Sequence, residues 1–389
     1  MHVLIAPDTF GPELGARAAG AALAEGWSQG APHDTVEVCA LSDGGHGFAA
    51  LVADAVGVPP AQDDVLVVPG TRGTSTTYID SCRYIDGVRS SVHLAEGIEH
   101  ALRAGASRIV VGLPGPHELS GGPDAGAGLL TVLGALSRRD ADRATTDRLG
   151  AVTAADLGGL AAVRARLRGI DLVGAAASDV PLLGLHGASA SAASAGVLGA
   201  EQAHDLERAI GHFAHVLRDV LADAADVRRP LELVGSPSSG ARAGAARALT
   251  GAPGTGAGGG LGLAICALGG RLVGGATLFS DVARTSERAG RADLVLTARG
   301  ELDGSSFHGS ALAVAVGAAA EWGVPCIAVA RTSVMSRRER ASVGLSALAD
   351  LRAPGVPAAD GPPTTVAELR STAERLARTW SPSRVLRRT

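Results

Sequence analysis

The sequence predicts an α/β protein: one parallel-sheet domain built from both chain ends, with a second α/β domain inserted between them. Three observations support this. Residues 2–6 form an unbroken apolar run, which is typical of a strand buried in a parallel sheet. Strand and helix patterns alternate over residues 2–55, and the same alternation returns over residues 292–330. We therefore expect one domain from residues 1–60 with 286–380, an inserted domain from 61–285, and a disordered basic tail at 381–389.

The opening segment contains two strand–helix units. The apolar run of residues 2–6 ends at Pro7 and Asp8, which indicates a buried strand that passes into a loop. Residues 13–30 have helical spacing, residues 36–41 form a second short strand, and a second helix extends to about residue 55. Strands that are joined by helices pair in parallel, so this order predicts a parallel sheet covered by helices.

The middle of the chain is less regular. Its expected strands are 65–68, 76–79, 108–113 and 170–175, and its expected helices are 94–104, 125–136 and 201–223. Residues 187–199 are rich in Gly, Ala and Ser, a composition that allows either a loop or a helix of small residues. At the end of the chain we expect strands at 292–297 and 324–330 and helices at 311–322 and 365–379.

Composition limits the classes of function. The chain has 389 residues with a net charge of -4 and 3% aromatic residues, which argues against binding to nucleic acid or to an anionic membrane. It contains no Lys, so every cationic role falls to Arg, protonated His or backbone N–H groups. The four cysteines are scattered and form no C-x-x-C pair. This pattern favours buried reduced thiols over a disulfide framework or a zinc site. The first residues have no basic lead-in to an apolar run, and we expect a cytoplasmic protein.

Acidic residues follow several predicted strands. Asp8 follows the first strand, Asp43 the second, Asp179 the strand at 170–175, and Asp303 comes shortly after the strand at 292–297. Asp124 opens a helix after a Gly- and Pro-rich turn. Ligands of open parallel sheets bind beyond the carboxyl ends of the strands, so these carboxylates are candidate site residues. Taken singly, each also fits a turn former or a helix cap.

Two glycine-rich segments are candidate phosphate-binding turns. Gly44 and Gly45 follow Asp43 at a helix start, where backbone N–H groups and the helix dipole attract anions. The segment 254–260 contains Gly256, Gly258 and Gly259 and lacks the G-K-[ST] of a Walker A loop. This second segment equally fits a turn that leads into a closely packed helix. Carboxylates beside phosphate-binding turns favour a Mg²⁺–nucleotide site or a base that accepts a hydroxyl proton.

The same segments, in this order, resemble the bacterial type I glycerate kinase family over nearly the whole chain. Residues 6–10 resemble the start of its A-P-D-S-F-K-G/E-S motif, and residues 41–47 resemble A-D-G-G-E-G-T. Residues 112–134 resemble G-x-G-G-S-A-T-N-D-G-G-A-G-M…A-L-G, with Asp124 at the Asp, and residues 178–184 resemble C/S-D-V-x-N-P-L-x-G with two residues missing. Residues 254–262 and 294–309 resemble G-A-G-A-A-G-G-x-G and L-V-I-T-G-E-G-R-x-D-x-Q-S-x-x-G-K.

The resemblance implies ATP-dependent phosphorylation of D-glycerate, or of a related small hydroxy acid, with Mg²⁺, and a Rossmann-like domain that carries an inserted α/β domain. By matching position it implies catalytic roles for Asp8, Asp43 and Asp179, one of which handles the metal or the glycerate hydroxyl. Substrate- or nucleotide-binding roles fall to Gly44, Gly45, Asp124, Gly256, Gly258, Gly259 and Asp303. The metal ligands are not assigned, and association of the chain with itself stays open.

Several positions depart from the family motifs. The Lys after Phe10 is Gly11, the Glu after Gly45 is His46, and the Gly-Glu after Thr297 is Ala298-Arg299. The final Lys of the last motif is Ser310. Phosphoryl transfer depends on cations that neutralise charge, so these losses leave a second hypothesis open. In that alternative the chain is a catalytically impaired paralogue that binds a ligand or acts in regulation.

Overall fold

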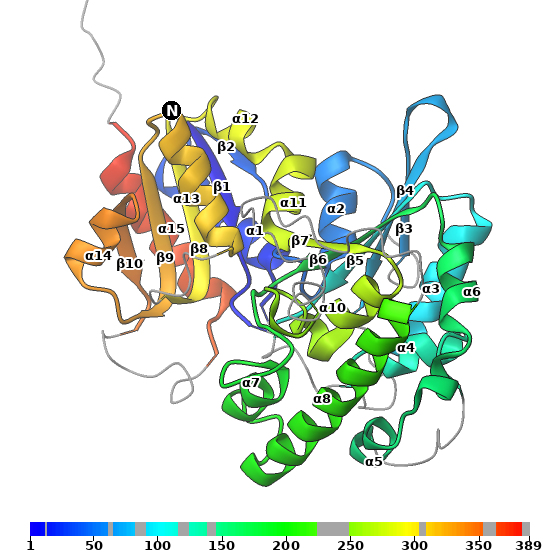
Figure 1. The fold of residues 1–389 in the computed structure, drawn as a ribbon. Coiled ribbons are helices and arrows are strands. Elements are labelled where there is room, and N and C mark those ends of the chain that lie inside the picture. The colour runs from blue at the N-terminus through cyan, green and yellow to red at the C-terminus, as the bar shows by residue number, and fades with distance from the viewer. Residues whose placement is uncertain are drawn as a thin grey trace, which may run out of the picture. The chain divides into compact units, whose positions relative to one another are not determined.

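The computed structural model describes residues 1–11, 14–60, 65–81, 91–115, 124–137, 145–223, 249–302, 309–352 and 363–382 (Figure 1). The chain divides into two compact units. The first consists of Met1–Ser42 with Phe279–Thr389, and the second is Asp43–Leu278. The mixture of helices and mainly parallel sheets confirms the predicted α/β fold class.

The first unit contains a five-stranded parallel sheet in the order β10-β9-β8-β1-β2. Its strands are β1 (His2–Pro7), β2 (Thr35–Val38), β8 (Leu294–Leu302), β9 (Cys326–Ser333) and β10 (Leu345–Asp350). At its centre β1 pairs with β8, and the register runs from Val3 opposite Leu294 to Pro7 opposite Ala298. The two ends of the chain are therefore joined by backbone hydrogen bonds within one sheet.

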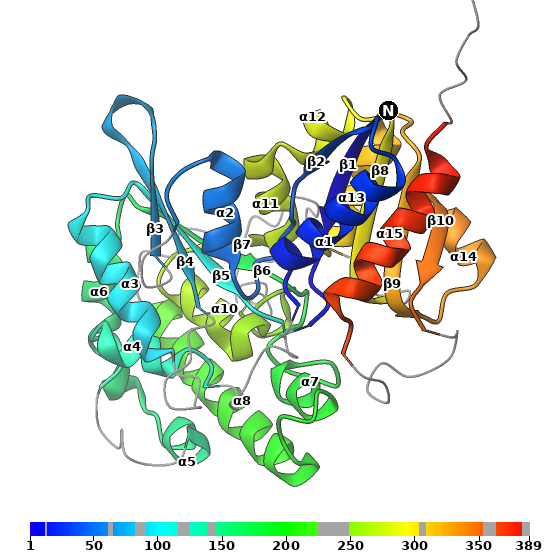
Figure 2. The ribbon, with the colours of Figure 1, turned by 180° about the vertical axis from the view of Figure 1, so that it is seen from behind.

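Helices cover both faces of this sheet. The two opposite views place α13 (Ala311–Glu321) in front of the sheet in Figure 1 and α1 (Ala16–Gly30) and α15 (Val366–Trp380) in front of it in Figure 2. The helices α12 (Thr285–Ala289) and α14 (Arg337–Ser342) are short. Apolar residues of α1 and α15 form one buried cluster with alternate residues of the central strands.

Small residues allow α1 and α15 to approach closely. A Cβ atom on Gly26 would lie 2.1 Å from the carbonyl oxygen of Arg370, and one on Gly30 would lie 2.4 Å from that of Glu374. Both contacts are with backbone atoms, which cannot rotate away as a side chain can. The two glycines, one helical turn apart on α1, thus set the distance between the helices.

The second unit contains the sheet β3-β4-β5-β6-β7, in which β3 is antiparallel to β4 and the other pairs are parallel. The strands are β3 (Val65–Pro69), β4 (Ser75–Asp80), β5 (Arg108–Leu113), β6 (Asp171–Ala176) and β7 (Arg271–Gly274). Its helices are α2 (Phe48–Val56), α3 (Val92–Arg103), α4 (Ala127–Val132), α5 (Thr145–Gly150), α6 (Leu160–Arg166), α7 (Ala188–Ser194), α8 (Ala200–Asp223) and α10 (Ala257–Ala267). Helix α11 (Gly275–Ala283) follows β7.

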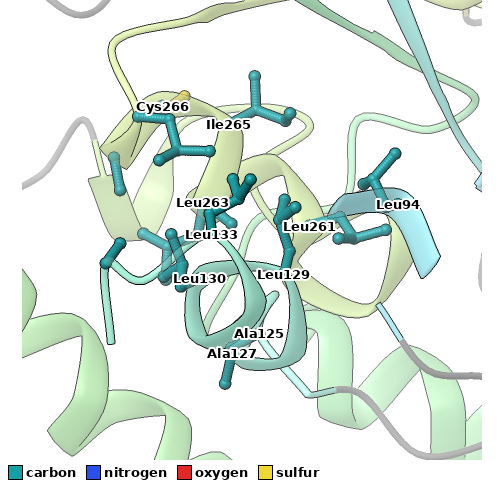
Figure 3. Packing of buried hydrophobic residues seen from close by; sticks show 14 of the residues in the cluster. Leu94, Ala125, Ala127, Leu129, Leu130, Leu133, Leu261, Leu263, Ile265 and Cys266 are labelled. Carbon is teal, nitrogen blue, oxygen red and sulfur yellow. The ribbon is translucent and has the colours of Figure 1, made fainter. Parts of the chain in front are cut away.

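The main core of this unit lies between the sheet and the helices α3, α4, α8 and α10. Leu129 and Leu130 of α4, and Leu133 directly after it, pack beside Leu261 and Leu263 of α10 (Figure 3). The tract 187–199, for which the sequence allowed a loop or a helix, contains α7.

The boundary between the units differs from the predicted one. We expected the first domain to extend to residue 60, but the contacts place it at Ser42. Helix α2 packs on the sheet of the second unit, where the rings of Phe48 and Tyr78 meet edge to face with centroids 6.0 Å apart. Gly112 of β5 makes this approach possible, since a Cβ there would lie 2.9 Å from the Phe48 ring. An apolar pattern shows that α2 covers a sheet, but it does not show which sheet.

Three cysteines, Cys39, Cys266 and Cys326, are buried free thiols, and Cys82 lies outside the described residues. Burial raises the pKa of the Cys266 and Cys326 thiols to about 12. None of the helices within the described ranges has the length and apolar character needed to cross a membrane.

The close approach of α1 and α15 predicts opposite effects for two Gly→Ala changes in helices of the first unit. Gly26→Ala should lower the free energy of unfolding by about 1–3 kcal/mol, because the added methyl overpacks a backbone contact. Gly317→Ala, in α13, meets nothing within 4 Å and should raise it by about 0.5–1 kcal/mol through helix propensity alone. Urea unfolding of the two variants measures both values. Equal effects would show that helix packing does not constrain residue 26.

Candidate functional site

Acidic residues lie at the carboxyl ends of parallel strands in both units. Asp8 directly follows β1 in the first unit. In the second unit Asp80 is the last residue of β4, and Asp179 follows the end of β6 at Ala176. Asp43 begins the second unit, five residues beyond the end of β2. The sequence named three of these four acids.

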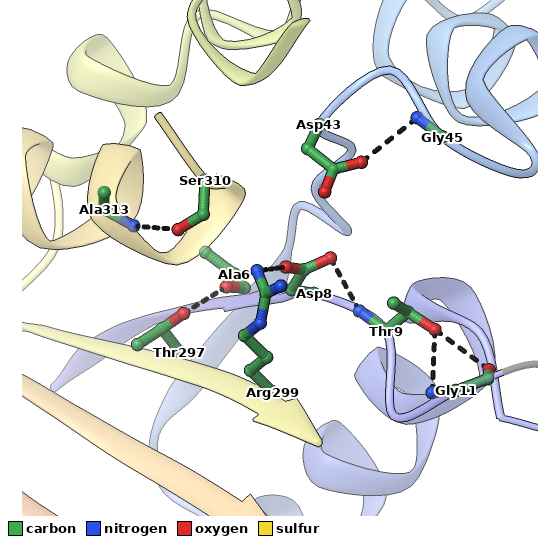
Figure 4. A network of polar contacts seen from close by, with 10 residues as sticks. All are labelled: Ala6, Asp8, Thr9, Gly11, Asp43, Gly45, Thr297, Arg299, Ser310 and Ala313. Atoms are coloured by element: carbon green, nitrogen blue, oxygen red, sulfur yellow. Dashed lines mark hydrogen bonds and ion pairs between the residues drawn. The ribbon is translucent and has the colours of Figure 1, made fainter. Parts of the chain in front are cut away.

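Asp8 is buried, with 3% of its surface exposed, and its carboxylate forms an ion pair with Arg299. The Nη1 atom of Arg299 lies 2.7 Å from Asp8 Oδ2, and the backbone N–H of Thr9 donates to Asp8 Oδ1 at 2.8 Å (Figure 4). The cation comes from β8, the strand beside β1, and the pairing of these two strands brings the two side chains together.

Asp43 shapes the turn that leads into α2. Its Oδ1 accepts the N–H of Gly45 at 3.1 Å (Figure 4). Gly44 adopts a φ of +101°, and a Cβ there would lie 2.3 Å from the carbonyl oxygen of Ala175 in β6. Glycine at 44 is therefore required both by the backbone conformation and by the close approach to β6. This turn presents the half-buried carboxylate of Asp43 beside the carboxyl end of β6.

Asp80 is a buried acid that the sequence analysis did not select. Its Oδ2 accepts the N–H of Gly47 at 2.6 Å, which fastens the turn before α2 to the end of β4. The rule that selected Asp8 and Asp43 was sufficient to find it, because Asp80 directly follows the expected strand at 76–79.

The segment that carries Asp179 is held by the glycine-rich segment before α10. The N–H of Gly256 donates to Val180 O at 2.9 Å, and Leu182 N–H donates to Thr255 Oγ1 at 3.1 Å. A Cβ on Gly256 would lie 2.2 Å from Pro181 O, so the two backbones are in direct contact. Asp179 itself is exposed. The result is an accessible carboxylate next to a backbone segment that the glycine-rich segment holds in place.

The glycines of 254–260 are buried, and several of their N–H groups are used within the protein. Gly258 N–H donates to Pro114 O and Gly260 N–H to Gly256 O, at 2.9 and 3.0 Å. Gly258, Gly259 and Gly260 all have positive φ, which interrupts the first turn of α10. These contacts match the packed-turn alternative that the sequence left open. A phosphate-binding role for Gly256, Gly258 or Gly259 stays a prediction.

Asp124 acts as a cap for α4. Its two carboxylate oxygens accept the N–H groups of Gly126 and Gly128 at 2.8 and 3.2 Å, and Ser91 Oγ donates to Oδ2 at 2.6 Å. Ser91 Oγ in turn accepts Leu129 N–H at 2.8 Å. These contacts account for an acid at this position, and its predicted role in substrate binding stays a prediction.

Asp303, also predicted to bind substrate or nucleotide, lies outside the described residues. Among the residues that the structure describes, no group of three or more His, Cys, Asp or Glu side chains is placed to hold a metal ion. Mg²⁺ commonly takes only one or two carboxylates from the protein and fills its remaining positions with phosphate oxygens and water. The segments that carry Asp43 and Asp179 both adjoin the end of β6, and a role for either acid in holding Mg²⁺ stays a prediction.

Comparisons with known proteins agree on one family. The family model described as "Glycerate kinase family" matches residues 3–79 and 84–381. An uncharacterized protein of Mycobacterium bovis (strain ATCC BAA-935 / AF2122/97) is 29% identical over 376 residues, which cover 89% of this chain and 83% of the relative. The glycerate kinase of Bacillus subtilis (strain 168) is 25% identical over 386 residues, with 92% of each chain covered.

A solved structure shares the fold. A crystal structure of a protein assigned as glycerate kinase 2, from Salmonella typhimurium LT2, superposes with a TM-score of 0.64 and 23% identity. The superposition covers 97% of this chain and 98% of the other. The resemblance found in the sequence motifs is thereby confirmed at the level of the family.

The contact between Gly256 and Pro181 predicts a loss of stability on Gly256→Ala. The added methyl would press on a backbone oxygen and force the Asp179 segment to move, at a cost of about 1–3 kcal/mol in the free energy of unfolding. Gly251→Ala, five residues earlier with nothing within 4 Å, is the matched control and should leave stability within about 0.5 kcal/mol. Denaturant unfolding that ranks the two variants equally would contradict this account of the glycine segment.

The capping contacts of Asp124 predict that Asp124→Ala lowers the free energy of unfolding by about 0.5–2 kcal/mol, because backbone N–H groups at the start of α4 lose their acceptors. Asp205→Ala removes an exposed acid on α8 that pairs with Arg208, and it should cost under about 1 kcal/mol. Thermal unfolding of the two variants provides the comparison. A neutral Asp124→Ala would mean that the cap does not stabilise α4.

Proposed function

Because this chain belongs to the glycerate kinase family, we propose that it catalyses the ATP-dependent phosphorylation of D-glycerate or of a related small hydroxy acid. Membership of the family supports a kinase-like phosphotransferase that acts on a small molecule. The observation that carries the finer proposal is the pair of accessible carboxylates, Asp43 and Asp179, on segments that adjoin the end of β6.

Asp43 and Asp179 would perform two tasks in this reaction. A kinase must hold the metal–nucleotide complex, and it must orient the acceptor hydroxyl and accept its proton. Mg²⁺, when bound, would neutralise the charge of the transferred phosphoryl group. The hydrogen bond from Gly45 N–H fixes Asp43, and the contact with Gly256 fixes the backbone around Asp179, so both acids are held in place before the substrate arrives. We leave open which of them serves the metal and which the hydroxyl.

Two further features belong to this proposal. The buried free thiols are typical of a reducing compartment, which supports a cytoplasmic location. A role of the Gly44–Gly45 turn toward a phosphate is carried over from the motif alone, because the Gly45 N–H donates to Asp43 Oδ1 within the protein.

A second candidate is a protein that binds the nucleotide or the acid without turning it over. Its supporting observations are the uncharged residues Gly11 and Ser310 at two motif lysines, and Arg299 in contact with the predicted catalytic Asp8. Nucleotide-dependent thermal stabilisation of the folded protein in the absence of any turnover would favour this candidate.

The proposal predicts that Asp43→Asn and Asp179→Asn each lower kcat/KM by roughly 10²-fold or more, because each removes a charge from the reacting site. An Asn at 43 still offers an oxygen to Gly45 N–H, so the turn is retained. Asp205→Asn, in an exposed ion pair on α8, is the matched control and should leave the rate unchanged. The measurement is ADP release from Mg-ATP with D-glycerate and with a panel of small hydroxy acids.

Rates of both variants within about twofold of the unchanged protein would exclude these acids from the chemistry. Release of ADP with another hydroxy acid but not with glycerate would identify the acceptor. A folded protein that releases no ADP with any member of the panel would overturn the proposed kinase activity. The second candidate, a protein that binds its ligand without turnover, would then remain.

A further inference from the structure

We infer that Arg299 binds an oxyanion of the substrates, a carboxylate or a phosphate, and that Asp8 is the positioning residue that orients it. The inference rests on the proposed function for the identity of the substrates. It assigns Asp8 a different task from the one that the motifs imply. In this chain Asp8 orients the guanidinium of Arg299, and the guanidinium binds the ligand.

The strand register places the two side chains together. The printed pairing of β1 with β8 ends at Pro7 opposite Ala298, and one further step puts Asp8 opposite Arg299. The ladder does continue, because Asp8 N–H donates to Ala298 O at 2.7 Å and Gly300 N–H donates to Thr9 O at 3.1 Å. Side chains opposite each other on neighbouring strands point to the same face, so the ion pair follows from the backbone.

The two partners differ in exposure. The Asp8 side chain is 4% exposed and the Arg299 side chain 28% exposed. Both Asp8 oxygens accept hydrogen bonds, one from Arg299 and one from Thr9 N–H. The carboxylate is thus enclosed, while the Arg299 side chain is partly exposed next to the carboxyl end of β1, where ligands of parallel sheets bind. A guanidinium has five N–H donors in a planar fork, so a bond to Asp8 fixes its orientation and leaves it able to bind an oxyanion.

The departures from the family motifs give a reason for a positive charge at position 299. In the motif that residues 294–309 resemble, a Glu stands where this chain has Arg299, and lysines stand at positions 11 and 310. The charge has therefore changed sign at 299 while both lysines are lost. Gly300 lies against the segment that leads to Gly11, since a Cβ at 300 would be 3.3 Å from the Phe10 backbone. Arg299 thus adds a positive charge to a strand whose backbone contacts the segment that lacks the motif lysine at position 11.

The charge at position 301 is also reversed relative to the family motif. The motif has an Arg at this position, where this chain has Glu301. Glu301 is 65% exposed and pairs with Arg331 of β9 at 3.3 Å. Its partner Arg331 differs from Asp8, the partner of Arg299.

The test uses Arg299→Gln, which removes the charge, and Arg299→Lys, which keeps the charge but loses the planar fork. Arg288→Gln is the matched control: Arg288 pairs with Glu37 at 2.5 Å in the same unit and is 27% exposed. Steady-state kinetics give KM for D-glycerate and for ATP separately. Thermal shifts with inorganic phosphate, with ADP and with D-glycerate report binding without turnover.

Arg299→Gln should raise KM for one anionic substrate by roughly 10- to 100-fold, with a smaller rise for Arg299→Lys and none for Arg288→Gln. A rise for D-glycerate identifies the carboxylate as the ligand, and a rise for ATP identifies a phosphate. The stabilisation by the matching anion should disappear in Arg299→Gln. Asp8→Asn should raise the same KM, and a purely structural role for Asp8 would leave that KM unmoved.

If Arg299→Gln fails to fold because Asp8 loses its ion pair, the double variant Asp8→Asn/Arg299→Gln removes both charges and takes its place. The inference is overturned if folded Arg299→Gln, or the double variant, keeps both KM values and the stabilisation by every anion. It is also overturned if none of the three anions stabilises the unchanged protein. If the protein has no kinase activity, the thermal shifts with phosphate, ADP and glycerate still decide the role of Arg299.

Discussion

The parallel pairing of β1 with β8 is the constraint on which the first unit depends. It joins residues near the start of the chain to residues almost three hundred positions later, and it encloses the second unit in sequence between them. The same register extends one step past the regular ladder and there brings a carboxylate and a guanidinium together. A backbone feature that closes the fold therefore also determines the charge at the carboxyl edge of the sheet, where ligands of such sheets bind.

Much of the fold was readable from the sequence because buried parallel strands are short unbroken apolar runs. The runs at residues 2–6, 108–113 and 170–175 correspond closely to β1, β5 and β6. Strands such as β7 and β10 were missed, because β7 has only four residues and β10 contains polar ones at a sheet edge. The assignment of α2 to the second unit depends on the Phe48–Tyr78 contact, which no local pattern encodes.

The candidate site was predictable in its acids but not in their partners. A carboxylate after a strand is a local signal, and it found Asp8 and Asp43; applied to every strand, it would also have found Asp80. Which group a carboxylate meets depends on register between distant strands, so the pairing of Asp8 with Arg299 needed the structure. The glycine segment at 254–260 was ambiguous for a related reason. Glycine permits both ligand binding and close packing, and only the hydrogen bonds to Pro114 and Val180 show how its N–H groups are used.

The division of the chain has a consequence for how it folds during synthesis. The second unit is a continuous stretch, Asp43–Leu278, with its own sheet and its own apolar core. It can begin to condense as soon as it leaves the ribosome, because each strand after β3 pairs with the strand before it in the sequence. The sheet of the first unit is completed later. Strands β1 and β2 are synthesised early, but β1 gains its partner β8 only after the intervening residues have been synthesised. The edge of β1 that pairs with β8 therefore stays unpaired until β8 has been made. A chaperone would have most to protect during that interval.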